Sequence, residues 1–431
     1  MILSFLLALA NAFPSDADTA PTPRWTAHFQ QTLITQGDGG FHADYSGPNS
    51  LDADGGQATS LTSTLFLGAR LWDGGEAYWN PEVNGGEGLD GSAGVAGFLN
   101  GETSHVTTVA PGWNWMARLF LRQTFDFGAP TDTLADGQNQ VATVVSDNRL
   151  VATVGKYCLD DIFDGNAFSH DPRTQFINSA LVSQGSWDYP ADTHGYTWAL
   201  ALEYYADAWA FRVASAAMPT VGNGIVLDYR PGQVQGQVAE VERDYEAHGK
   251  GALRALAYFN LYHGGNYALA LQDTDVEAGI LQSRRYGRAK YGFGLDWDHQ
   301  WTHDLGTFAR AGWSDGQNEN WAFTEIDQSA SAGVQLGGAL WGRAHDKFGI
   351  AEAVDGISQV HQDFLSRGGT GFVVGDGALS YAPESILETY YAAAVLSWLT
   401  ISGDYQFVAD PAYNRDRGPV NIFAVRVHTE I

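Results

Sequence analysis

The sequence predicts an all-β fold, a transmembrane antiparallel β-barrel whose strands each have an apolar and a polar face. Three observations predict it. Apolar and polar residues alternate with a period of two over many segments. No window of about 18 consecutive apolar residues exists, which excludes a membrane-spanning helix. Trp and Tyr gather near the ends of the alternating segments, as they do at a lipid–water boundary.

The clearest alternation covers residues 288–298, where Ala, Tyr, Phe, Leu and Trp share one face and Arg, Lys, Gly and Asp share the other. Residues 116–127 and 196–205 repeat the pattern. Further strands are predicted to begin near Trp25, Ser60, Leu150, Trp209, Gly251, Leu305, Ala330, Ile386, Trp398 and Val420.

The polar faces carry several charges of both signs, too many for the core of a small soluble sandwich. The apolar faces are therefore predicted to point outward into lipid. A secreted soluble β-protein that binds glycans stays open as an alternative at this point.

The formal net charge is −27, from 50 acidic and 23 basic residues, the opposite sign from a nucleic-acid-binding protein. The single cysteine, Cys158, permits no internal disulfide. No H-E-x-x-H, no C-x-x-C and no phosphate-cradling glycine loop is present. Asp160 and Asp161 are paired carboxylates, but nothing places two carboxylates across a substrate as a glycosidase requires. We predict no enzyme activity, no cofactor, no metal and no nucleic-acid partner.

Three parts of the chain are distinguished. Residues 1–12 combine an apolar run with Ala10-Asn11-Ala12, which predicts a signal peptide whose true start lies here or upstream. Residues 13–24 are rich in Pro, Asp and Thr and are predicted to be a flexible lead-in. Residues 25–431 are predicted to form one barrel domain. Within it, the irregular stretch 160–190 is rich in aromatic residues, so we expect it to be ordered and folded into the barrel.

Several motifs occur in a characteristic order. They are Trp79-Asn80-Pro81-Glu82, G-V-A-G-F-L-N-G-E at 94–102, M-A-R-L-F-L-R-Q-T-F at 116–125, D-G-N-A-F-S-H-D-P-R-T-Q-F at 164–176, A-G-W-S-D-G at 311–316 and N-R-D-R-G-P-V at 414–420. Together they resemble the carbohydrate-selective outer-membrane porins of the OprB type, from about residue 60 to the end.

The resemblance implies about 16 strands, the outer membrane of a Gram-negative bacterium, and passive diffusion of small, glucose-like sugars. The implied partners are small sugars and outer-membrane lipid. The oligomeric state is left open, with a monomer as the working expectation. An outer-membrane barrel of another class, a polysaccharide exporter or a barrel enzyme, remains the alternative.

A sugar channel needs aromatic rings for the apolar face of a pyranose and polar groups for its hydroxyls, and it must bind weakly enough to release. Arg118 and Arg122 share a polar face, and strand geometry separates them by about 13 Å, so they line a wall. Arginine offers five donors in a fixed plane. The residues predicted to line the path are Arg70, Glu76, Glu82, Arg118, Arg122, Asp126, Arg173, Trp187, Tyr189 and Arg310.

A competing hypothesis explains the same residues structurally. The charged residues would form buried ion pairs that brace loops, and Trp187 and Tyr189 would pack a loop. The segment 169–173, which contains Arg173, is predicted to belong to an inserted loop that narrows the pore. Asp296, Asp298 and Arg310 are predicted to face the lumen without an assigned role.

Overall fold

The alternating segments pair into one closed antiparallel barrel of sixteen strands in a computed structural model that describes residues 23–102 and 109–431. Each strand pairs with its neighbour in the chain, and β1 closes the ring on β20. Closure leaves no unpaired strand edge, which a spanning sheet requires in lipid. The predicted barrel is confirmed, and a two-sheet sandwich is excluded.

The barrel strands are β1 (Trp25–Asp38), β2 (Gln57–Trp72), β3 (Gly75–Gly86), β4 (Val109–Asp126), β7 (Asn148–Tyr157), β8 (Thr197–Ala206), β9 (Trp209–Ala216), β12 (Gln235–Glu246), β13 (Lys250–Gly264), β14 (Arg285–Thr302), β15 (Leu305–Ser314), β16 (Gln328–Gly337), β17 (Lys347–Gly356), β18 (Glu384–Leu396), β19 (Leu399–Ala409) and β20 (Val420–Glu430). Two small sheets pair β5 (Asp132–Leu134) with β6 (Thr143–Val145) and β10 (Met218–Pro219) with β11 (Leu227–Asp228).

The helices are short: α2 (Ser179–Val182), α3 (Tyr267–Ala270), α4 (Val276–Ser283), α5 (Gln359–Ser366) and the 3-10 turns η1 (Leu89–Ser92), η2 (Leu159–Asp161), η3 (Gly338–Trp341) and η4 (Pro411–Tyr413). Within the described part of the chain, none of these helices has the length and apolar character needed to cross a membrane.

The two faces of the strands divide as the alternation predicts. In β14 the Leu295 side chain is 56% exposed on the outside, whereas the next residue, Asp296, is 2% exposed on the inside. Exposed tryptophans mark one rim of the barrel at Trp25, Trp72, Trp209, Trp301 and Trp398. An apolar outer band with an aromatic girdle is the surface that a lipid bilayer requires.

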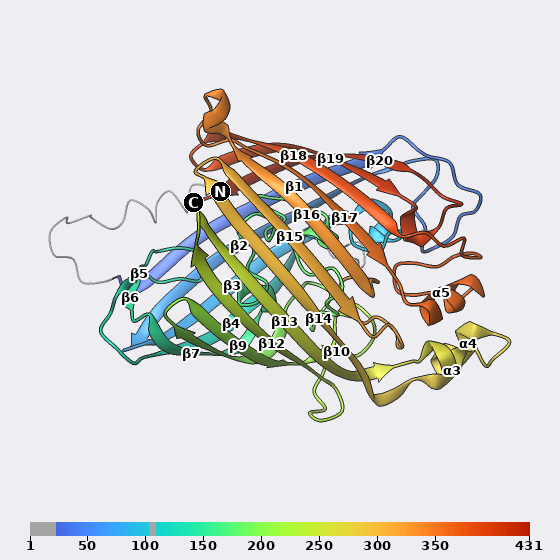
Figure 1. The fold of residues 1–431 in the computed structure, drawn as a ribbon, viewed down its shortest axis with the longest axis horizontal. Helices are drawn as coiled ribbons and strands as arrows, with labels where there is room; N and C mark the ends of the chain where they lie inside the picture. Colours follow the sequence, from blue (N-terminus) through green and yellow to red (C-terminus); the bar gives the residue numbers. More distant parts are fainter. Residues whose placement is uncertain (1–22, 103–108) are drawn as a thin grey trace.

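The two rims differ in their connections. At the rim with these tryptophans, five turns contain only two or three residues, and the longer segments 127–147 and 338–346 also lie there. We call it the short-turn rim. The opposite end, the long-loop rim, has only longer connections. Figure 1 shows α3, α4 and α5 at one end of the barrel and the β5–β6 hairpin at the other.

The interior is not uniformly hollow. Long loops fold back onto the inner faces of β15 and of β17–β20, where they bury one large apolar cluster that includes Phe98, Phe176, Ile326, Ile386 and Val408. We call this the packed side of the lumen. The inner faces of β1–β4, the open side, border the cavity described below.

The predicted signal peptide, 1–12, and residues 13–22 of the predicted lead-in lie outside the described residues. The first described strand, β1, begins at Trp25.

Candidate functional site

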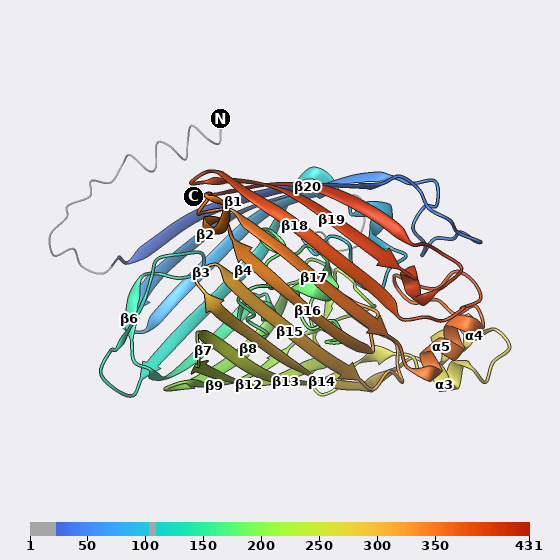
Figure 2. The ribbon, with the colours of Figure 1, turned by 45° about the horizontal axis from the view of Figure 1, so that its top comes forward.

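The connection between β7 and β8, residues 158–196, runs inside the barrel, and we call it the inserted segment (Figure 2). Most of its residues are buried although it contains little regular structure. Irregular buried backbone must find hydrogen-bond partners for its N–H and C=O groups. The expectation that aromatic residues order this stretch inside the barrel is confirmed, because Phe163, Phe176 and Trp187 are all buried.

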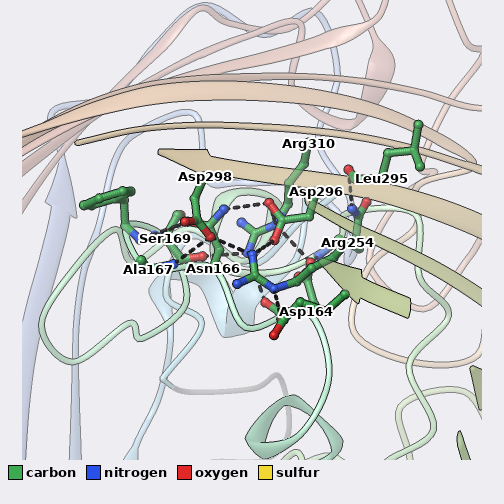
Figure 3. A network of polar contacts seen from close by, with 12 residues as sticks. Asp164, Asn166, Ala167, Ser169, Arg254, Leu295, Asp296, Asp298 and Arg310 are labelled. Carbon is green, nitrogen blue, oxygen red and sulfur yellow. Dashed lines mark hydrogen bonds and ion pairs between the residues drawn. The ribbon is translucent and has the colours of Figure 1, made fainter. Parts of the chain in front are cut away.

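Arg310 of β15 holds the inserted segment by its backbone. Its guanidinium donates from Nη1 to the Leu181 carbonyl at 2.8 Å and from Nη2 to the Ser169 carbonyl at 2.7 Å. Its Nε donates to Oδ1 of Asp164 at 3.2 Å (Figure 3). Five donors in a fixed plane suit such a multiple anchor. Arg310 therefore fixes three points of the segment against the wall.

A ladder of charges on the neighbouring strands continues this anchor (Figure 3). Arg254 of β13 donates to Oδ2 of Asp298 at 2.6 Å and to Oδ2 of Asp296 at 3.1 Å. Asp296 also accepts from the Asn166 side chain of the inserted segment at 2.6 Å. Each buried charge thus has an opposite charge or a hydrogen-bond donor beside it, which is the condition for placing charges in an interior.

The middle of the inserted segment is also anchored on the packed side. Arg426 of β20 donates from Nη1 to the carbonyls of Pro172 at 2.6 Å and Gln175 at 2.7 Å. Glu388 of β18 accepts from the Ile177 N–H at 2.6 Å. Because buried polar networks hold the segment at several points between Asp164 and Leu181, it forms a fixed partition across the lumen.

A cavity of about 690 Å³ lies between this partition and the open side. That volume falls within the range of about 300–1,000 Å³ typical of small-molecule sites. Its charged, histidine and ring-bearing lining residues are Glu82, Glu102, Asp160, Asp161, Asp171, Glu430, Arg118, Arg173, Lys347, His170, His194, Phe66, Tyr196 and Phe323.

The two arginines of the cavity are both paired. Arg118 donates from Nε and Nη2 to the two carboxylate oxygens of Asp161, each at 2.6 Å, and lies over the Tyr196 ring at 5.2 Å. Arg173 donates from Nε to Oε1 of Glu102 at 2.8 Å. Such bidentate or short pairs fix the planes of the guanidinium groups, and the carboxylate of each pair balances the positive charge.

Four polar atoms on the cavity lining are buried without a hydrogen-bond partner among the described residues: Oδ1 of Asn84, Nη1 of Arg118, Oδ1 of Asp160 and Nδ1 of His170. Burial, with the nearby charge of Asp161, raises the pKa of Asp160 to about 7. Burial, with the charge of Arg310, lowers the pKa of His170, which favours the neutral ring. Buried polar groups without partners are rare in folded proteins, so these atoms mark the part of the lining whose hydrogen-bonding capacity is not used within the described residues.

Three aromatic rings complete the cavity: Phe66 of β2, Tyr196 at the end of the inserted segment, and Phe323 of the β15–β16 loop. Phe323 is supported from behind. The Tyr189 ring meets it edge-on at 4.9 Å, and the Trp187 ring meets Tyr189 edge-on at 5.0 Å. The rings that were predicted to stack on sugar, Trp187 and Tyr189, are thus a second layer behind a ring that lines the cavity.

Three of the ten predicted residues line the cavity: Glu82, Arg118 and Arg173. Glu82 accepts from the Thr64 hydroxyl at 2.8 Å and from the Tyr196 hydroxyl at 3.1 Å. All three arise from different elements, so the fold brings them together in a way that their spacing in the sequence does not reveal.

Four predicted residues lie on the same wall toward the short-turn rim, and three of them contact the segment 127–147 directly. Arg122 donates to the Asn139 carbonyl at 3.0 Å, and Asp126 accepts from the Ser146 N–H at 2.7 Å. Asn139 lines the cavity, whereas Arg122 does not.

Arg70 and Glu76 are the other two of these four residues. Arg70 donates to the Ala142 carbonyl at 2.8 Å, and Glu76 lies 3.8 Å from Arg70 and accepts from the Tyr78 hydroxyl at 2.7 Å. Their contacts match the competing hypothesis that charges brace loops. The same holds for Arg310, whose partners belong to the inserted segment.

Several cavity residues were not among the predicted ones, including Glu102, Asp160, Asp161, His170, Phe66, Tyr196 and Phe323. The acidic pair and the histidine stand in the stretch whose inward folding was predicted. Their direction within that stretch depends on contacts with β4, β13 and β15, which local sequence does not specify.

Comparison with known proteins adds to this geometry. A family model described as the carbohydrate-selective porin, OprB family, matches residues 59–431. The fold is similar to that of Pseudomonas putida OprB at high pH, with a TM-score of 0.72 at 16% identity over 95% of this chain and 94% of that one. It is also similar to the outer membrane channel DcaP of Acinetobacter baumannii, with a TM-score of 0.50 at 11% identity over 94% and 97%. No curated protein matches the chain.

Proposed function

We propose, because the chain belongs to the carbohydrate-selective porin, OprB family, that the cavity of about 690 Å³ is a passage for small, glucose-like sugars by passive diffusion. Membership makes the protein an outer-membrane porin of a Gram-negative bacterium, in a family of channels rather than enzymes. The finer proposal concerns which sugars pass and which residues select them.

One observation carries the proposal: an aromatic ring and accessible charged groups meet on the lining of the same cavity. Phe323, which is half-buried, offers a flat apolar surface for the C–H face of a pyranose. The Arg173 side chain, 17% exposed, can donate to a sugar hydroxyl, and the Asp161 carboxylate, 32% exposed, can accept from one. Together they replace the water that a sugar loses in a narrow passage.

The pairing of the arginines suits a transient contact. The positive charge of Arg118 is balanced by Asp161, and that of Arg173 is balanced by Glu102. A neutral sugar therefore meets oriented donors whose positive charge is balanced locally by these carboxylates. Flux needs binding that is favourable enough to admit a solute and weak enough to release it.

The partition argues against the polysaccharide exporter. The inserted segment crosses the lumen and is held between Asp164 and Leu181 by Arg310 and Arg426, so a polymer chain would meet a fixed obstacle. The barrel enzyme is disfavoured by the acidic pair. Asp161 is committed to Arg118, whereas a glycosidase needs two carboxyl groups facing one another across the substrate.

Proteoliposomes test the proposal. We expect glucose to enter faster than mannitol, which has similar size and hydroxyls but no pyranose ring, and faster than an amino acid of smaller size such as alanine. The control is liposomes that contain the heat-denatured protein. Equal rates for glucose, mannitol and alanine would overturn the claim of sugar selectivity while leaving the channel itself intact.

A further inference from the structure

The lipid-facing surface of the barrel is not smooth. An apolar groove of about 620 Å³ crosses β4, β7 and β8 on the outside, separate from the sugar passage. Its floor includes Leu121, Val154, Trp198 and Leu200, and each of these side chains is exposed. An ordinary barrel exterior is convex, so a concave apolar strip of this size can hold a lipid chain more closely than the surrounding wall does.

The groove is bordered by a turn between β11 and β12. Tyr229 and Arg230 of this turn line the groove, and the Tyr229 side chain is 66% exposed. The Arg230 guanidinium has one carboxylate partner among the described residues, Asp228 at 3.2 Å, and lies over the Tyr286 ring at 4.4 Å. Its side chain is 53% exposed, so an outside ligand can reach it.

A second arginine is the chain neighbour of Tyr286, the residue whose ring lies under Arg230. Arg285 is the first residue of β14, adjacent to Tyr286 in the chain, and is exposed. No carboxylate of the described residues lies within ion-pair distance of Arg285. In a chain with a net charge of −27, Arg230 on the groove lining and the exposed Arg285 next to Tyr286 bring two accessible arginines to this part of the long-loop rim.

The groove opens toward one leaflet. Short turns of outer-membrane barrels face the periplasm and long loops face outside. Arg230 and Arg285 belong to connections and strand ends at the long-loop rim, so they lie at the headgroup level of the outer leaflet. That leaflet is built from a phosphorylated glycolipid, and arginine binds phosphate through paired N–H donors.

We propose that this groove and its arginines form a binding site for the phosphorylated glycolipid of the outer leaflet. An acyl chain lies along the apolar floor at Leu121, Val154 and Leu200, and a headgroup phosphate accepts from Arg230 and Arg285. Charge and apolar shape are thus complementary to one lipid at one height in the membrane.

Native mass spectrometry of the full, detergent-purified protein tests the site, with diphosphorylated lipid A as the probe. We expect a saturable lipid A adduct whose apparent affinity falls about tenfold in the double variant Arg230→Ala, Arg285→Ala, because two charge-assisted contacts are lost. Arg243→Ala is the matched control. Arg243 is also exposed and stacks on an aromatic ring, Trp209 at 4.8 Å, but it lies toward the short-turn rim.

Three outcomes would overturn the proposal: no saturable adduct, an equal loss in the Arg243→Ala control, or an unchanged affinity in the double variant. Phosphatidylglycerol at the same concentration separates the glycolipid from anionic lipids in general. If it binds as tightly as lipid A and responds equally to the double variant, the assignment to the glycolipid is wrong. Glucose flux of the double variant is expected to stay unchanged, since neither arginine lines the sugar passage.

Discussion

The two sides of the lumen are built from the same kind of strand and reach opposite outcomes. On the packed side, loops fold onto β15 and β17–β20 and bury an apolar cluster. On the open side, β1–β4 face a cavity of about 690 Å³. Arg310 and Arg426 face the inserted segment and bind its backbone carbonyls, whereas Arg118 lines the cavity, and its Nη1 has no hydrogen-bond partner among the described residues.

This difference shows that the role of an inward-facing charged side chain depends on whether a loop packs against it. An arginine under a loop becomes an anchor, because the carbonyls of irregular backbone need donors. An arginine beside a cavity stays available to a solute. Substitutions on the two sides should therefore affect different measurements, stability on one and permeation on the other.

The largest effect is expected from Arg310→Ala. It removes the cation from buried Asp164 and the donors from two buried carbonyls, and breaking a buried ion pair costs about 3–5 kcal/mol. This loss of stability is measured as the free energy of unfolding in urea, with the folded fraction read from the heat-dependent shift in gel mobility. Arg122→Ala, which loses one hydrogen bond to a carbonyl, should cost less. Equal costs would mean that Arg310 is not an anchor.

Arg118→Ala should instead change permeation. In this variant the barrel should still assemble. We expect the glucose concentration at which half of the block of ion current is reached to rise about tenfold, because a charged donor is lost. Single-channel recording with added glucose measures this, and Arg118→Lys should recover part of the effect. An unchanged glucose response would show that Arg118 does not border the passage.

A smaller effect is expected from pH. Acidic residues outnumber Arg and Lys on the cavity lining, so the channel should prefer cations. The pKa of Asp160 is raised to about 7, which leaves the group ionised at pH 8 and mostly protonated at pH 6. Reversal potentials in a KCl gradient should therefore show cation preference falling about twofold from pH 8 to pH 6. Asp160→Asn should remove most of this fall in cation preference. If the fall persists in Asp160→Asn, another titrating group causes it.

The smallest effect is expected from Trp187→Phe. Trp187 reaches the cavity only through Tyr189 and Phe323, so glucose flux should stay within about twofold of the unsubstituted protein. Phe323→Ala, which removes the lining ring itself, should lower glucose flux more than mannitol flux. If Trp187→Phe matched Phe323→Ala in proteoliposome uptake, the layered arrangement of the rings would be contradicted.

Most of the barrel could be predicted because alternation is a local property. The strands without a prediction are β3, β12 and β17, and each has a reason. Pro81 coincides with a register shift in β3. The outward positions of β12 include Gln237 and Arg243, and β17 carries Glu352 on its exposed face, so the apolar side of these strands is weak.

The candidate site could be predicted only in part. Arg118 and Arg122 have the same residue type and lie on the same strand face, and the sequence does not separate them. The structure does, because the segment 127–147 contacts Arg122 through the Asn139 carbonyl, whereas Arg118 lies beside the cavity. Which inward residue a loop covers depends on contacts between distant parts of the chain, and alternation does not record them.

The pairing of β1 with β20 has a consequence for how the barrel assembles. The Thr32 hydroxyl and Nδ1 of His428 lie 2.9 Å apart across this seam although 396 positions separate them in the chain. Contacts so distant in sequence form late, because a long loop must close first. Until β20 reaches β1 during assembly, the sheet keeps two edges whose unpaired N–H and C=O groups can pair with other chains. A fragment that lacks residues 420–431 therefore keeps both edges unpaired, and we expect it to be proteolysed faster than the closed ring.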